Sequence, residues 1–203
     1  MAEPYIIIVD GQQGSFKTSF MSVIAHQMGY FMGDRLSLFS NYELKDSKPF
    51  RSYTDFLEVA KCHTSLILLD EAQATLSSRG FSNKGQNSFT ELMLFLRKLR
   101  TTMFLTSVRF EFIDSRIREI CDIYIYATEE NGFVTYDIFD FQRVRFIKRV
   151  QISVAEYKNI LTQLNLFRTW RPVRSTSLPD EKTFQLFLEK LIIENDKYWE
   201  QVI

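Results

Sequence analysis

The sequence YIIIVDGQQGSFKTS occupies residues 5–19 of the 203-residue chain. Residues 5–9 are a continuous apolar run of strand length, which is typical of a parallel strand buried on both faces. A turn containing glycine follows, and residues 18–32 fit a helix. The order of strand, glycine turn and helix predicts the start of an α/β domain.

Strands and helices alternate up to about residue 127, which favours right-handed crossovers and a mainly parallel central sheet flanked by helices. We predict strands at 36–39, 66–69, 103–108 and within 141–150. We predict helices at 53–62, 89–99, 113–120, 154–164 and 181–201. An antiparallel hairpin is expected at the edge of the sheet, around the turn Asn131-Gly132. We expect residues 1–150 to form the core, with 151–203 a helical extension packed on the same domain.

Composition restricts the class of protein. Hydrophobic residues make up 45% of the chain, enough for a substantial core, and the formal net charge is zero. Binding of nucleic acid would therefore need a local basic patch. Cys62 and Cys121 adjoin apolar stretches and indicate reduced core thiols. The longest apolar runs are far below the roughly 18–20 residues that span a bilayer, and the N-terminus has no signal-peptide pattern. We expect a soluble cytoplasmic protein.

The glycine turn has the spacing of a phosphate-binding loop. Backbone N–H groups of such a loop, at a helix N-terminus, hold the β- and γ-phosphates of a nucleotide. Lys17 would bridge the β/γ oxygens, and the Thr18 hydroxyl would bind Mg²⁺. The residues expected to contact the nucleotide are Gly11, Gln12, Gln13, Gly14, Ser15, Phe16, Lys17, Thr18 and Ser19. The alternative is a plain strand-turn-helix with an exposed lysine.

Phe16 departs from the pattern of this loop, because the residue before the lysine is normally glycine. Phenylalanine strongly disfavours a positive φ. We therefore expect Phe16 to adopt a β or α conformation, with its ring turned away from the phosphates.

Two carboxylates close the apolar strand at residues 66–69. The strand would bring Asp70 to the mouth of the sheet, where it can hold Mg²⁺ through water. Glu71 would then act as the general base toward the attacking water. A strand that ends in Asp-Glu is weak evidence by itself, but it follows the phosphate loop with room for one helix and one strand between. Together the two motifs predict ATP and Mg²⁺ as cofactors.

The order of several further motifs resembles the FtsK–HerA superfamily over residues 5–127. Within it, the likeness is to zonular-occludens-toxin-like proteins and to the small genome-packaging ATPases of tailless icosahedral viruses. The residues that carry it are Gly11–Thr18, Asp70-Glu71-Ala72-Gln73, Arg79, Phe95–Arg100, Leu105-Thr106-Ser107, Ile113–Arg118 and Asp122. The resemblance implies a RecA/FtsK–HerA-like fold. Family members usually place Gln or Asn as a γ-phosphate sensor where this chain has Thr106 and Ser107.

The resemblance also implies a hexameric ring that moves DNA through its centre. The first hypothesis is a packaging ATPase that drives double-stranded DNA into a capsid. It would act in the host cytoplasm or with the virion, with a capsid or portal-vertex protein as a partner. The second is a zonular-occludens-toxin-like assembly or secretion ATPase. Proteins of that type usually carry a membrane-spanning helix after the ATPase domain, and we expect none in this chain. The third is a nucleotide-binding switch or a kinase.

A ring ATPase needs a cation from the neighbouring subunit to stabilise the transferring phosphoryl group. We expect Arg79 or Arg97 in this catalytic role, chosen from four arginines at or near the carboxyl ends of the strands, Arg79, Arg97, Arg100 and Arg116. Each of them can equally be a solvated surface charge. Candidate DNA contacts are the basic strand with Arg143, Arg145, Lys148 and Arg149, the arginines 168, 171 and 174 around Trp170, and the loop 78–87. The alternation in the first set also fits an ordinary exposed strand.

Overall fold

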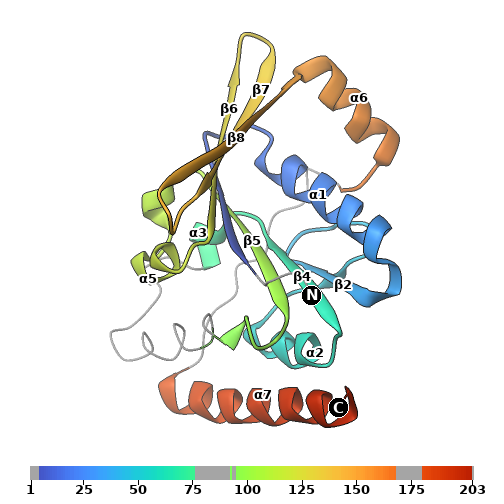
Figure 1. Ribbon diagram of the computed structural model, residues 1–203, viewed down its shortest axis with the longest axis vertical. Coiled ribbons are helices and arrows are strands. Elements are labelled where there is room, and N and C mark those ends of the chain that lie inside the picture. The colour runs from blue at the N-terminus through green and yellow to red at the C-terminus, as the bar shows by residue number, and fades with distance from the viewer. Residues whose placement is uncertain (1–4, 76–91, 93–94, 168–179, 203) are drawn as a thin grey trace.

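The computed structural model describes residues 5–75, 92, 95–167 and 180–202 (Figure 1). Within these residues one eight-stranded sheet forms the centre of the molecule. Its strands are β1 Ile6–Asp10, β2 Leu36–Ser40, β3 Lys48–Pro49, β4 Thr64–Leu69, β5 Thr101–Ser107, β6 Ile123–Glu130, β7 Phe133–Asp140 and β8 Arg145–Ser153. They lie in the order β3-β2-β4-β5-β1-β6-β7-β8.

The sheet is parallel from β3 to β6 and antiparallel at the β7–β8 edge. The central strand β1 lies between β5 and β6, with Asp10 opposite Ser107 on one side and Tyr126 on the other. The loops that follow β1, β4 and β5 therefore meet at one edge of the sheet. The predicted fold, a P-loop α/β domain with a mainly parallel sheet and an antiparallel hairpin at its edge, is confirmed.

Helices cover both faces of this sheet. The α-helices are α1 Lys17–Met32, α2 Phe56–Ala60, α3 Ala72–Thr75, α5 Ser115–Glu119, α6 Val154–Leu164 and α7 Glu181–Val202. Short 3-10 turns are η1 Gly33–Arg35, η2 Tyr53–Asp55 and η3 Phe110–Phe112. Figure 1 shows α1 and α6 on one side of the sheet, α3 and α5 on the other, and α7 lying below α2.

Alternation along the strands divides the core into two clusters. Ile6 and Ile8 of β1 belong to the cluster beneath α2, α5 and α7, whereas Val9 belongs to the cluster beneath α1 and α6. Because successive side chains of a strand point to opposite faces, a strand with helices on both sides must be apolar throughout. This explains why the continuous runs in β1 and β4 indicated buried parallel strands.

The hairpin has the predicted turn. Asn131 and Gly132 have φ of 53° and 78°, and β6 and β7 pair antiparallel up to the turn. A two-residue turn with two positive φ angles matches the twist of the flanking strands, and Asn-Gly is its preferred sequence. At the other side of β7, β8 is an exposed edge strand, and its charges, among them Lys148, oppose pairing with another edge.

The C-terminal helix packs against the core. Phe184, Phe187, Leu188 and Leu191 are buried in the cluster that contains α2, while the division of the chain at residue 150 stays a prediction. A loop expected at 79–86, five residues of the predicted helix 89–99, and all but the first two residues of an irregular stretch expected at 166–179 lie outside the described residues. In the described part of the chain, none of the helices has the length and apolar character that crossing a bilayer requires.

Candidate active site

The loop that joins β1 to α1 requires glycine at its first position. Gly11 has a φ of 152°, and a Cβ there would overlap the carbonyl oxygen of Ala127 on β6. Ser15 closes the loop, with its N–H and its hydroxyl both donating to the carbonyl oxygen of Gln12, at 3.2 and 2.8 Å. The loop thus curls tightly against β6 at Ala127, directly before the N-terminus of α1.

The side chain of Lys17 folds back over this loop. Its Nζ donates to the carbonyl oxygens of Gly11 and Gln12, both at 2.7 Å. Partial burial lowers the pKa of the ammonium from its ordinary value, and three nearby carboxylates, led by Asp70, oppose that shift. The cation is therefore held over the loop, surrounded by negative charge.

The conformation predicted for Phe16 is wrong. Phe16 adopts the left-handed conformation, with φ 60° and ψ 28°, which is the geometry that glycine gives at no steric cost. For a non-glycine residue this conformation costs roughly 1–2 kcal/mol. The ring packs against Tyr157, with centroids 5.5 Å apart, and the carbonyl accepts a hydrogen bond from Tyr136 at 3.1 Å. These tertiary contacts offset the local cost, and no local sequence rule includes them.

Thr18, at the start of α1, is joined to Asp70, which directly follows β4. The Thr18 hydroxyl lies 2.9 Å from each carboxylate oxygen of Asp70. Thr106 of β5 donates to Oδ1 of the same carboxylate at 2.5 Å and accepts the N–H of Glu71 at 3.0 Å. The ends of β4 and β5 and the start of the helix after the phosphate loop thus meet around one carboxylate.

Glu71 lies exposed beside this cluster, with a φ of 49°. The Thr106 hydroxyl fixes the backbone that carries it. Thr106 lies at the predicted place of the sensor, but its hydroxyl is committed to Asp70 and Glu71. The hydroxyl of Ser107 donates instead to the carbonyl oxygen of Arg109 at 2.7 Å.

Sequence reasoning missed Asn41, which follows β2. Its amide donates to the carbonyl oxygen of Asp70 at 2.9 Å and accepts the N–H of Asp70 at 2.8 Å. This side chain extends the β2–β4 pairing by one more residue and fixes the backbone beneath the carboxylate. The signal in the sequence was an asparagine at the end of a strand, on the edge where ligands bind.

Asp10 was also missed. It is 8% exposed, and its Oδ2 accepts a hydrogen bond from the Tyr124 hydroxyl at 2.9 Å. Burial first, and this hydrogen bond second, raise the pKa of the Tyr124 phenol, so Tyr124 stays a donor. Asp10 directly precedes the loop, and its charge contributes to the field at Lys17.

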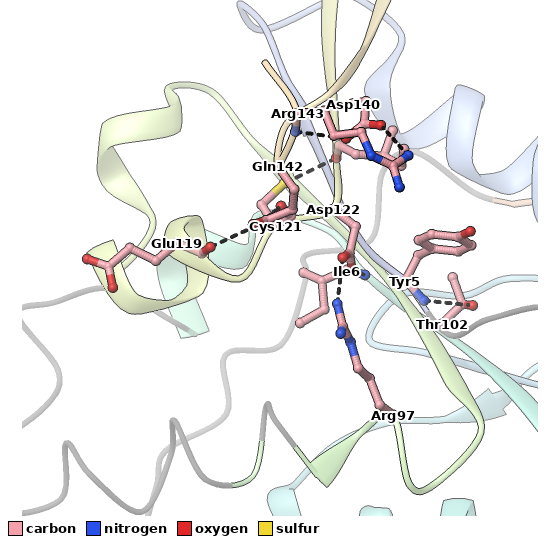
Figure 2. Close-up of polar contacts among 11 residues, drawn as sticks. Tyr5, Ile6, Arg97, Thr102, Glu119, Cys121, Asp122, Asp140, Gln142 and Arg143 are labelled. Atoms are coloured by element: carbon pink, nitrogen blue, oxygen red, sulfur yellow. Dashed lines mark hydrogen bonds and ion pairs between the residues drawn. The ribbon is translucent and has the colours of Figure 1, made fainter. Parts of the chain in front are cut away.

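The predicted location of the arginines is wrong for two of them. Arg97 forms an ion pair with Asp122 at 2.6 Å, and Asp122 in turn accepts the N–H of Ile6, the first residue of β1 (Figure 2). Arg97 therefore lies at the amino edge of the sheet, opposite the phosphate loop. Arg100 is buried at the same edge, where it precedes β5. These residues end the segment that enters β5, so they must lie where the parallel strands begin.

Of the other arginines predicted to act in catalysis or DNA binding, those that the structure describes form ion pairs with nearby aspartates. Arg116 pairs with Asp114 at 2.7 Å near the start of α5, and Arg79 lies outside the described residues, as do the arginines around Trp170. On β8, Arg149 pairs with Asp137 at 2.6 Å. Arg143 and Arg145 share Asp140, at 3.2 and 3.7 Å. Roles in catalysis or DNA binding for these residues stay predictions.

A phosphate loop at the end of β1, with a lysine and a helix N-terminus, and an acidic pair at the end of β4 define a P-loop nucleoside triphosphatase. The sequence profile of the ATPase family associated with various cellular activities (AAA) matches residues 7–129, more than half of the chain. The chain belongs to this family, and it is an ATPase that binds and hydrolyses ATP.

Two solved structures share the fold. The N-terminal domain of zonular occludens toxin from Neisseria meningitidis is 17% identical, with a TM-score of 0.61 over 82% of this chain and 100% of that chain. The genome packaging NTPase B204 from Sulfolobus turreted icosahedral virus 2, in complex with ATP-gammaS, is 12% identical, with a TM-score of 0.54 over 73% of this chain and 98% of that chain. Both types of relative named by the sequence resemblance are thus found. No curated protein matches the chain.

Proposed function

We propose that this ATPase hydrolyses ATP with Mg²⁺ and couples the reaction to the movement of double-stranded DNA, as a genome-packaging motor. The observation that carries the hydrolytic part is the contact between the Thr18 hydroxyl and both oxygens of Asp70. It joins the helix after the phosphate loop to the acidic pair at a single point, where we would place a metal-bound γ-phosphate.

The donor atoms at this point fit Mg²⁺. Hydroxyl and carboxylate oxygens are the ligands it takes, usually one or two from the protein together with water and phosphate oxygens. Thr18 and Asp70 would hold the ion, which would neutralise charge on the β- and γ-phosphate oxygens. In the described part of the chain no group of three or more His, Cys, Asp or Glu could form a metal cage, which agrees with a site that the nucleotide completes.

The remaining groups have separate tasks. The loop N–H groups at the start of α1 bind the phosphates, and Lys17 exchanges the carbonyl oxygens of Gly11 and Gln12 for β/γ oxygens. Glu71 orients the attacking water and accepts its proton. An arginine of a neighbouring subunit, Arg79 or Arg97, stabilises the transferring phosphoryl group in a homo-hexameric ring.

Two observations support DNA as the cargo. The fold is shared with a genome packaging NTPase, and β8 with its approach presents four basic side chains, Arg143, Arg145, Lys148 and Arg149. Two carboxylates, Asp137 and Asp140, pair with three of them and leave a modest positive excess. Such a surface would bind phosphates of any sequence, with an affinity that falls as salt rises. Within a virus, a capsid or portal-vertex protein would anchor the ring, in the host cytoplasm or on the virion.

A second candidate function is an assembly or secretion ATPase of the zonular-occludens type. The observation that favours it is the match to all of the N-terminal domain of that toxin, with a TM-score of 0.61. In that case turnover would respond to a membrane-bound partner, and DNA would have no effect.

Steady-state ATP hydrolysis with and without double-stranded DNA, for the wild type and for Glu71→Gln, tests the proposal. The proposal expects turnover that DNA stimulates and that the substitution abolishes, while ATP binding is kept. Turnover that is indifferent to DNA across a range of salt concentrations would reject the packaging motor in favour of the second candidate. Phosphoryl transfer to a small acceptor would indicate a kinase.

A further inference from the structure

The phosphate loop contains one residue whose conformation depends on a distant part of the fold. Phe16 holds the left-handed conformation immediately before Lys17, at the N-cap of α1, and its phenyl ring has no polar atom that could cap the helix. Its carbonyl oxygen accepts two hydrogen bonds, from the N–H of Phe20 at 2.9 Å and from the hydroxyl of Tyr136 at 3.1 Å. The first belongs to the opening turn of α1, whereas the second comes from β7, 120 residues along the chain.

The surroundings of Tyr136 hold its hydroxyl beside the carbonyl oxygen of Phe16, with the side chain of Tyr157 as a second hydrogen-bond partner. Tyr136 is 2% exposed, and its ring packs 4.3 Å from the ring of Phe20. Tyr157 of α6 completes the group, with ring centroids 5.5 Å from Phe16 and 6.3 Å from Tyr136. Burial raises the pKa of Tyr136, so the hydroxyl keeps its proton under all ordinary conditions.

The orientation of the peptide after Phe16 decides where the next N–H groups point. In a phosphate loop, the amides of the residues that open the helix are among those that bind the phosphate oxygens. Glycine reaches the required geometry without help, but phenylalanine favours negative φ values that would turn the Phe16–Lys17 peptide away. Some other part of the protein must hold this peptide.

We propose that Tyr136 is a positioning residue for nucleotide binding: its hydroxyl, supported by the ring of Tyr157, holds Phe16 in the glycine-like conformation that forms the phosphate site. The proposal rests on the ATP site argued above and adds a dependence on β7 and α6. Without the Tyr136 hydroxyl only a fraction of molecules have a competent loop, and the apparent affinity falls by that fraction.

A double-mutant cycle between Tyr136→Phe and Phe16→Gly tests the dependence. Tyr136→Phe removes one neutral hydrogen bond, and we expect the dissociation constant for MgATPγS, measured by titration calorimetry, to rise roughly fivefold. In the Phe16→Gly background the same substitution should change the constant less than about twofold, because glycine needs no support. Tyr53→Phe is the matched control, since Tyr53 packs against α7 in the other core cluster and should bind as the wild type does.

The rescue by glycine separates positioning from a general loss of structure. If Tyr136→Phe binds as tightly as the wild type, or if it weakens binding equally in the Phe16→Gly background, the proposal is overturned. A wild type that binds no nucleotide would instead reject the ATP site itself.

Tyr157→Leu provides an independent test should Tyr136→Phe fold poorly. It should weaken binding, speed amide exchange of residues 12–20 in the free protein, and be rescued by Phe16→Gly. Unchanged binding, or a loss of binding that Phe16→Gly does not rescue, would contradict the proposal.

Discussion

The hydroxyl of Thr18 lies 2.9 Å from both carboxylate oxygens of Asp70, although 52 residues separate them in the sequence. One of these residues opens the helix after β1, and the other follows β4. The contact therefore links the two tasks of such a site, holding phosphate and holding a cation, through one pair of oxygen-bearing side chains.

We expect Thr18→Val to reduce ATP turnover about a hundredfold or more, because it removes an oxygen ligand next to the transferring phosphate. The matched variant Thr18→Ser keeps the hydroxyl and should retain most of the activity. Turnover measured as a function of Mg²⁺ concentration checks this. Wild-type turnover in Thr18→Val would contradict the role of the hydroxyl, and a loss in Thr18→Ser as large as in Thr18→Val would show that the methyl group is required as well.

Thr106 should affect catalysis through the acidic pair. Its hydroxyl bonds to Asp70 and to the N–H of Glu71, and hydrogen bonds to charged groups contribute about 1.5–3 kcal/mol. Thr106→Val is expected to lower kcat about tenfold or more, with a smaller change in the affinity for ATP, and Thr106→Ser should be close to the wild type. A loss confined to ATP affinity would contradict this role.

The two glycines of the phosphate loop should differ sharply in their tolerance of alanine. At Gly11 a Cβ would overlap the backbone of Ala127, so Gly11→Ala must displace β6 or the loop and should abolish nucleotide binding. At Gly14 no atom lies within 4 Å of the added Cβ, and the φ of 90° leaves only backbone strain, which costs about 1–2 kcal/mol. Calorimetric affinity and thermal melting of both variants check this order.

Two neighbouring arginines should differ in their effect on stability. Arg100 is 8% exposed, donates to the carbonyl oxygens of Ala60 and Cys62, and lies 3.7 Å from the ring centroid of Tyr198. Arg100→Ala is expected to cost about 2–4 kcal/mol of unfolding free energy. Arg97→Ala removes the partner of Asp122, whose side chain is 11% exposed but still accepts the N–H of Ile6, and should cost about 1–2 kcal/mol, less than Arg100→Ala.

Arg97→Ala also tests the predicted role in a neighbouring site. Because the variant should fold normally, its ATP turnover reports on catalysis alone. A large loss of turnover that appears only in the assembled ring would support Arg97 acting in trans. Wild-type turnover in the ring would leave Arg79 as the remaining candidate.

Asp114 should make stability depend on pH in the acid range. Hydrogen bonds from the Arg116 side chain are the main cause that holds the pKa of Asp114 below its ordinary value of 3.8. A carboxyl with a depressed folded-state pKa stabilises the protein above the unfolded value, and this stabilisation disappears as pH falls through the folded value. Asp114→Asn should therefore flatten the fall in unfolding free energy below about pH 4, as measured by denaturant titrations at a series of pH values.

Local sequence patterns were sufficient to predict much of the fold and the two main motifs of the site. The apolar runs of β1 and β4, the glycine turn and the Asp70-Glu71 pair are each contained within a few residues. The parallel topology then places them at one edge of the sheet. The same rule could have placed Arg97 and Arg100 at the opposite edge, since both precede β5 directly, but the sequence interpretation assigned them to the wrong edge.

Other features could not be predicted, because distant residues decide them. Phe16 is held by Tyr136 and Tyr157, and a φ preference that considers one residue gives the opposite answer. Asn41 matters only because β2 lies beside β4. The hydrogen bond that Asp10 accepts comes from Tyr124 on the neighbouring strand β6.

The left-handed Phe16 has a consequence for the transfer of this motif between proteins. A phosphate loop with glycine before the lysine carries its geometry in its own sequence, and it can be grafted onto any strand and helix of suitable spacing. The segment from Gly11 to Thr18 does not determine its own conformation, because Phe16 also needs its contacts with Tyr136 of β7 and Tyr157 of α6. A chimera that received this loop alone would lose its shape, whereas one that also received the two tyrosines would keep it.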